Sequence, residues 1–178
     1  MGRFWQLVRK TRFVIMIELN SKTRHDFLDV EWVKKLLDAG VDMSDAKYSI
    51  VSPKFVDDYY EVVYGDEMSW SAHAVSPECY KYVCPTYTVS ELLYKLHEWI
   101  HPTIDGKEYK GGLRFIKDAP LYLFYYNLKR DGEEKPNEGY IFAEYEHPIE
   151  SLAAVLIQCH EKEIGFVAKD TGDISDKE

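Results

Sequence analysis

Positive charge is scarce in this sequence: 22 lysine and arginine residues stand against 31 aspartate and glutamate residues, which gives a formal net charge of −9. Binding to the phosphate backbone of nucleic acids depends on clustered Lys and Arg, so we expect nucleic acid not to be a partner. The start of the chain is an exception, because residues 1–15 contain four basic residues and no acid. We interpret residues 1–15 as a basic N-terminal arm, or as an extension upstream of a natural start at Met16.

Cysteine and long apolar runs are scarce as well. The three cysteines, Cys79, Cys84 and Cys159, are an odd number and too few for a disulfide scaffold, so we expect free thiols. No apolar stretch is long enough to span a membrane, and the short run after the basic arm lacks the small-residue cleavage site of a signal peptide. These absences predict a protein of a reducing cytoplasm, without membrane association.

The rest of the composition suits a folded protein, because 178 residues that are 46% hydrophobic can form one domain or two small ones. In the first half we expect a helix at 30–39, where Asp29 can cap the start and Gly40 can end the last turn. The expected apolar stripe of this helix consists of Trp32, Val33, Leu36 and Leu37. Strand-like runs follow at 47–51, at 59–64 and near 80–83.

The second half has clearer signals. Thr88 and Glu91 form a capping box, so a helix should begin there and continue to about Ile100. A last helix should begin at Pro148, which suits a first helical turn, and apolar residues recur at helical spacing from there to His160. Between the helices we expect three strands, at 112–117, 121–129 and 139–146. The middle strand is apolar on both faces, which is typical of a strand that is covered on both sides.

These elements predict an α+β fold with an antiparallel sheet and about three main helices. We expect an N-terminal α/β part at 16–85, a C-terminal α-β-β-β-α unit at 86–168 and an acidic tail at 169–178. The alternative is that residues 16–168 form one compact domain.

Three stretches of the second half carry a resemblance to a group of proteins: CPTYTVSELLYKL, APLYLFYYNLKRDG and HPIESLAAVLIQCHEKEIGFV. Over roughly 85–168, and more loosely over 30–39, the chain resembles small uncharacterised proteins of phages, prophages and gut Bacteroidetes. In those proteins a CP-T segment precedes a helix, a Tyr-rich antiparallel hairpin and a closing helix. The resemblance implies a small cytoplasmic protein of a phage or mobile element, a kind of protein that often binds a host or phage component. It implies no activity, ligand or functional residue.

The stretch LHEWIH contains His97, Glu98 and His101 in the H-E-x-x-H spacing of zinc peptidases. Two His one helical turn apart can both bind one zinc ion, and the Glu between them can take a proton from metal-bound water. Against this, Pro102 disfavours helix at His101, and the three residues lie away from the apolar face of the expected helix. One interpretation is therefore a zinc site with His97 and His101 as ligands and Glu98 as catalytic base. The other is an amphipathic helix whose outer face happens to contain this pattern.

Two further constellations involve cysteine. His73, Cys79 and Cys84 could join Cys159 or His160 in a structural zinc site, because thiolate and imidazole are suitable ligands. Cys84 or Cys79 could also act as a nucleophile with a distant His as base, although neither lies in a known nucleophile motif. The simpler interpretation is that the cysteines are small, partly buried side chains and that the protein needs no cofactor.

Aromatic residues are abundant, with 14 Tyr, 8 Phe and 4 Trp. Tyr favours strands, so sheet propensity and core packing account for many of them. Neighbouring tyrosines in a strand point to opposite faces, so some should be exposed unless the sheet is covered twice, and exposed Tyr and Trp are good interface anchors. The candidate interface residues are Tyr59, Tyr60, Trp70, Tyr125 and Tyr126.

Together the observations favour a non-enzymatic protein of a phage or mobile element that acts through protein–protein binding. Because the chain is acidic, we expect the partner to be a protein with a basic patch, or a second copy of the same chain. One alternative is a zinc-dependent hydrolase that uses His97, Glu98 and His101. Another is a homo-oligomeric structural component, such as part of a virion.

Overall fold

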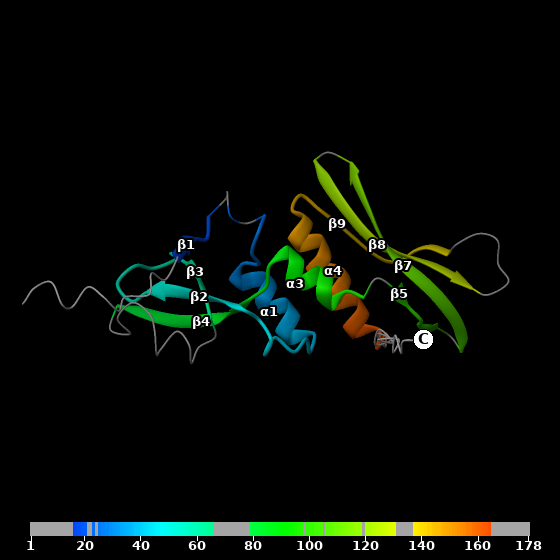
Figure 1. The fold of residues 1–178 in the computed structure, drawn as a ribbon, viewed down its shortest axis with the longest axis horizontal. Coiled ribbons are helices and arrows are strands. Elements are labelled where there is room, and N and C mark those ends of the chain that lie inside the picture. The colour runs from blue at the N-terminus through cyan, green and yellow to red at the C-terminus, as the bar shows by residue number, and fades with distance from the viewer. Residues whose placement is uncertain are drawn as a thin grey trace, which may run out of the picture. The chain divides into compact units, whose positions relative to one another are not determined.

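A computed structural model describes residues 16–20, 23, 25–65, 79–97, 99–104, 106–118, 120–130 and 137–164. These residues form three helices and two antiparallel sheets, so the chain has the α+β fold that the sequence predicts (Figure 1). The chain divides into two compact units, the first up to Leu92 and the second from Leu93 onward, whereas we expected the division near residue 85. The arm at 1–15 and the tail at 169–178 lie outside the described residues.

The first unit contains a four-stranded antiparallel sheet in the order β1-β3-β2-β4. Its strands are β1 (Met16–Glu18), β2 (Tyr48–Pro53), β3 (Glu61–Tyr64) and β4 (Tyr80–Thr86). Their positions confirm the strands expected at 47–51, 59–64 and 80–83, with bounds that differ by a few residues. β2 is an inner strand of this sheet. Its consecutive residues Ile50 and Val51 point to opposite faces, and both are fully buried, each in a different core cluster.

Helix α1 (Val30–Asp38) confirms the helix expected at 30–39. The Asp29 side chain accepts a hydrogen bond from the backbone N–H of Trp32 at 3.0 Å, and such a cap stabilises a helix by about 1 kcal/mol. Gly40 follows the helix with a φ of +83°, a conformation that glycine adopts without strain. Leu37 differs from the expected stripe, because it is 47% exposed while Trp32, Val33 and Leu36 are buried.

The second unit contains an antiparallel sheet in the order β5-β7-β8-β9, with β6 paired to β7 beside this path. Its strands are β5 (Trp99–Ile100), β6 (Thr103–Ile104), β7 (Lys107–Asp118), β8 (Leu121–Arg130) and β9 (Asn137–Tyr145). The three long strands confirm the expected strands at 112–117, 121–129 and 139–146. With α3 (Val89–Lys95) before them and α4 (Pro148–Glu161) after them, the second half keeps the expected α-β-β-β-α order with two very short strands added.

Helix α4 begins with Pro148, as predicted, and packs against β8 and β9 on one side of the sheet (Figure 1). The sheet residues on that side include Phe124, Tyr126 and Ile141, which are 7%, 0% and 0% exposed. Ser151 of α4 joins the two strands, because its hydroxyl donates to the carbonyl of Tyr122 at 2.6 Å and accepts from the N–H of Tyr145 at 3.0 Å. Among the described residues, no helix combines the length and the apolar character needed to cross a bilayer.

The helix expected from Thr88 to about Ile100 is shorter than predicted. The capping box is present, since Glu91 accepts from the N–H of Thr88 at 2.8 Å, but α3 ends at Lys95. The chain then becomes extended, and Trp99–Ile100 pairs with β7 as β5. Ile100 is fully buried in this strand, so the apolar side chain that suggested a helix is buried in an extended conformation instead.

The expectation that β8 is covered on both sides is wrong for one of its faces. Phe124, Tyr126 and Leu128 are buried on the side of α4, whereas Leu123 and Tyr125 on the other side are only half-buried. Among the described residues of this unit, α4 is the helix that packs on the sheet, and it covers one face. We call the other face the outer face, and define it by Arg114, Ile116, Leu123, Tyr125, Phe142 and Glu144.

Candidate functional site

The H-E-x-x-H pattern does not lie on a helix. His97 is half-buried just beyond α3, His101 is exposed after β5, and Glu98 lies outside the described residues. Trp99–Ile100, between the two histidines, is a strand, whereas two His ligands of one zinc ion are one helical turn apart in the zinc-peptidase pattern. The helical geometry on which the zinc-peptidase interpretation depended is therefore absent.

The cysteines have the environment of structural thiols. Cys159 is buried and Cys84 is half-buried, and burial raises the pKa of each thiol to about 12. Both are protonated at neutral pH, so neither is an activated nucleophile. Cys79 is exposed, and His73 lies outside the described residues. In the described part of the chain, no three His, Cys, Asp or Glu residues lie close enough to hold a metal ion.

The candidate interface tyrosines have different environments. Tyr126 is a core residue and not an interface residue, because it is 0% exposed and its hydroxyl donates to the carbonyl of His97 at 2.7 Å. Burial raises the pKa of Tyr126 well above its ordinary value. Tyr59 and Tyr60 are half-buried beside β3, and Trp70 lies outside the described residues. Tyr125 lies on the outer face, where its half-buried side chain remains available for contact.

The outer face consists of two rows of three residues across β7, β8 and β9. In one row Arg114 pairs with Tyr125, which pairs with Phe142; in the next, Ile116 pairs with Leu123, which pairs with Glu144. Directly opposed residues of antiparallel strands share a face, so the six side chains project on the same side of the sheet. The four apolar members are therefore contiguous, and the two charged members stand at opposite corners.

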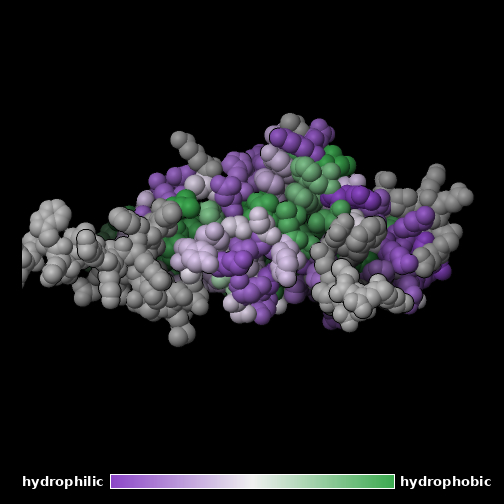
Figure 2. All heavy atoms as spheres, viewed as in Figure 1, coloured by the Kyte–Doolittle hydropathy of each residue, from purple (hydrophilic) through white to green (hydrophobic). Residues whose placement is uncertain are grey.

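Exposure differs between the two faces where α4 lies over the sheet, at the level of Phe142 on β9. On the outer face Ile116 is 46% exposed and Phe142 is 51% exposed, whereas Ala143, the neighbour of Phe142 on β9, is 5% exposed under α4. In Figure 2 the tip of the β7–β8 hairpin is polar, and apolar residues follow directly below it. Apolar side chains of this size on three neighbouring strands form a surface suited to contact with another molecule.

The tip of the hairpin also exposes aromatic side chains on the side of α4. Phe115 is 52% exposed and stacks on Tyr122 with the ring centroids 6.2 Å apart, and the Lys117 ammonium lies 5.3 Å from the centre of the Tyr122 ring. These contacts pack side chains near the tip against one another on one side of the sheet, while Ile116 projects on the other. The outer face is thus carried by paired strands.

The first unit has two further features with polar groups or a cavity. Glu61 accepts a hydrogen bond from the Tyr59 hydroxyl at 3.1 Å and lies opposite Glu18 in the β1–β3 register. Desolvation, followed by the bond to Glu61, raises the pKa of Tyr59, and desolvation and the Glu61 charge raise the pKa of Tyr80. This arrangement places two acidic residues side by side on β1 and β3, and it keeps both tyrosine hydroxyls protonated at neutral pH.

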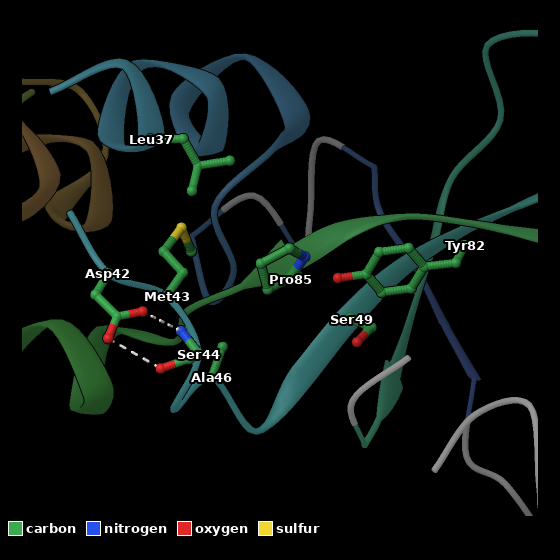
Figure 3. Close-up of a pocket in the computed structure, with 8 residues that line it drawn as sticks. All are labelled: Leu37, Asp42, Met43, Ser44, Ala46, Ser49, Tyr82 and Pro85. Atoms are coloured by element: carbon green, nitrogen blue, oxygen red, sulfur yellow. Dashed lines mark hydrogen bonds between the residues drawn. The ribbon is translucent and has the colours of Figure 1, made fainter. Parts of the chain in front are cut away.

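The second feature is a pocket of 310 Å³ (Figure 3). The Asp42 carboxylate accepts hydrogen bonds from the N–H and the hydroxyl of Ser44 at 2.9 and 3.0 Å, and the Ser49 hydroxyl donates to the carbonyl of Gly65 at 2.6 Å. These polar groups hold the local chain, so the pocket offers mainly an apolar wall to a ligand. The lining residues are Leu37, Asp42, Met43, Ser44, Ala46, Ser49, Tyr82 and Pro85.

The sequence interpretation included Tyr125 but missed Ile116 and Phe142. A signal was present, because Phe115 and Ile116 are adjacent large apolar residues within a strand, and such neighbours must point to opposite faces. The sequence of β9 repeats the pattern with Ile141 and Phe142.

No protein-family model matches the chain, and no curated protein or solved structure matches it significantly.

Proposed function

We propose that this protein acts by binding another protein through the outer face of the second unit, and not by catalysis. The observation that supports the proposal is the contiguous apolar surface of Ile116, Leu123, Tyr125 and Phe142, which is carried by three paired strands. Rigid aromatic and aliphatic side chains lose little conformational entropy on binding, and they exclude water over a large area.

The chemistry around this surface favours a protein as the partner. Arg114 and Glu144 border the apolar centre, so the face combines an apolar core with a charged rim of both signs. This is the usual anatomy of a protein–protein interface. A net charge of −9 disfavours an extended contact with nucleic-acid phosphates. The resemblance of residues 85–168 to small phage and Bacteroidetes proteins supports a setting in a phage or mobile element.

The test compares two full-length variants as baits for partners in an extract of the source cells. Phe142→Asp places a charge in the middle of the outer face, whereas Tyr94→Asp places the same charge on α3, where Tyr94 is 86% exposed. We expect a partner that is retained by the wild type and by Tyr94→Asp but lost from Phe142→Asp. Equal recovery of every bound protein by all three baits would show that the outer face is not the binding surface.

A further inference from the structure

The six residues of the outer face have a diagonal arrangement. Arg114 and Glu144 occupy one pair of opposite corners, on β7 and β9 and in different rows. Ile116 and Phe142 occupy the other pair of corners, and all four corner residues are exposed. The half-buried Leu123 and Tyr125 lie between them on β8. Opposite charges are thus separated across an apolar centre.

This arrangement is complementary to itself. A two-fold axis that runs in the plane of the face, along the Ile116–Phe142 diagonal, exchanges the two charged corners. When a second copy is placed on the face by this axis, Arg114 of each copy faces Glu144 of the other, and the apolar centres meet. The strands of the two sheets then cross at a large angle, close to the orthogonal class of sheet packing. Two-fold contacts of this kind are the commonest in homo-oligomers.

We infer that the outer face binds a second copy of this chain, so that the protein is a symmetric dimer with two intermolecular Arg114–Glu144 pairs around a shared apolar centre. The inference rests on the proposed function and names the partner for that surface. Charge complementarity sets the register of the two copies, and burial of the apolar centre supplies most of the binding free energy.

The edge of the sheet is less suited to self-association than its face. β9 ends the strand order of this sheet, and an uncovered edge strand can pair with another chain. However, the side-chain amide of Gln158 on α4 donates to the carbonyl of Phe142 at 2.7 Å, so that carbonyl is already engaged. Packing face to face uses the exposed side chains and leaves this hydrogen bond intact.

The first experiment measures the mass of the full-length chain by sedimentation velocity over a range of concentrations. We expect a monomer–dimer equilibrium for the wild type and for Tyr94→Glu, and a monomer for Phe142→Glu. Both substituted side chains are exposed, at 86% and 51%, so both variants should fold, and far-UV circular dichroism checks this. A wild-type monomer at all concentrations, or a dimer that persists in Phe142→Glu, would overturn the inference.

The second experiment tests the two-fold geometry by exchanging charge. Arg114→Glu leaves four acidic corners in a dimer and Glu144→Arg leaves four basic corners, so each variant alone should self-associate about tenfold more weakly than the wild type. In an equimolar mixture each acidic corner meets a basic one, so a mixed dimer should form with nearly wild-type affinity. If the two variants do not restore each other, the paired corners are not in contact.

These outcomes separate the inference from the function on which it rests. A monomeric wild type whose bait experiment still depends on Phe142 would reject the second copy as the partner but would leave protein binding by the outer face in place. A monomeric wild type with no Phe142-dependent partner would reject both.

Discussion

The hydroxyl of Ser151 offers the sharpest test of how the second unit holds the outer face. Ser151 is 0% exposed, and it donates to the Tyr122 carbonyl at 2.6 Å while accepting from the Tyr145 N–H at 3.0 Å. Tyr122 and Tyr145 are register partners on β8 and β9, so one side chain of α4 fixes the helix to both strands. We expect Ser151→Ala to weaken the whole unit, because it removes both hydrogen bonds at once.

The magnitude follows from the two backbone groups that lose this partner. Both hydrogen bonds are only partly buried, and a bond of this kind contributes about 1 kcal/mol, so the loss of two should lower the free energy of unfolding by about 2 kcal/mol. For a unit of this size, 1 kcal/mol corresponds to roughly 4–8 °C in melting temperature, so the melting temperature should fall by about 10 °C or more.

The assay is urea denaturation of the full-length variant, with thermal melting as a second measurement. Ser52→Ala is a matched control, because Ser52 is also buried, at 2% exposed, but its hydroxyl makes only a long contact of 3.4 Å to the carbonyl of Pro53. The control should lose less than about 1 kcal/mol. A Ser151→Ala variant as stable as Ser52→Ala would refute the reasoning that Ser151 links α4 to both strands.

Three other predictions concern buried groups of the two units. Gly111→Ala should cost about 1–3 kcal/mol in unfolding free energy, because a Cβ there overlaps the Leu128 side chain. In a double-mutant cycle measured by urea denaturation, Leu128→Ala should relieve part of that cost. Tyr126→Phe should cost about 1 kcal/mol, because its hydroxyl holds the carbonyl just beyond α3; an unchanged denaturation midpoint would contradict this. The free energy of unfolding should fall as the pH rises above 9, because unfolded thiols lose their protons there while the buried thiols of Cys84 and Cys159 keep theirs up to about pH 12. At pH 10 the loss of unfolding free energy is about 1.4 kcal/mol per thiol. A Cys84→Ala/Cys159→Ala variant should show a smaller decline with pH.

The elements that the sequence predicted well are those defined by local signals. Asp29 and the Thr88–Glu91 box mark helix starts, because a side chain caps a backbone group within three residues. Pro148 marks the start of α4 for a similar local reason. The long strands were recognisable from runs of aromatic and β-branched residues that end at turns. None of these features depends on contacts between distant residues.

The end of α3 could not be predicted in this way, because distant residues determine it. Local propensity favours helix through Trp99, yet Trp99 and Ile100 pair with Gly112 and Gly111 of β7. The hydroxyl of Tyr126, on β8, fixes the carbonyl of His97 in the same segment. Tertiary contacts therefore override the helical pattern, and the two residues between Glu98 and His101 of the apparent H-E-x-x-H motif form a strand.

The grouping of Tyr125 with Tyr126 as candidate interface residues has the same cause, because contacts between distant residues determine which of the two is buried. The sequence of β8 is apolar on both faces, so it predicts cover on both sides and cannot indicate which face a helix takes. Contacts with α4 determine it. Ser151 and Gln158 of α4 bond to backbone groups of β8 and β9, and these bonds help to hold the helix on the side of Tyr126. Tyr125 is then left on the uncovered side with Phe142 opposite it. Among the described residues no helix of this unit covers that face, and the protein binding that we propose would remove its apolar side chains from water.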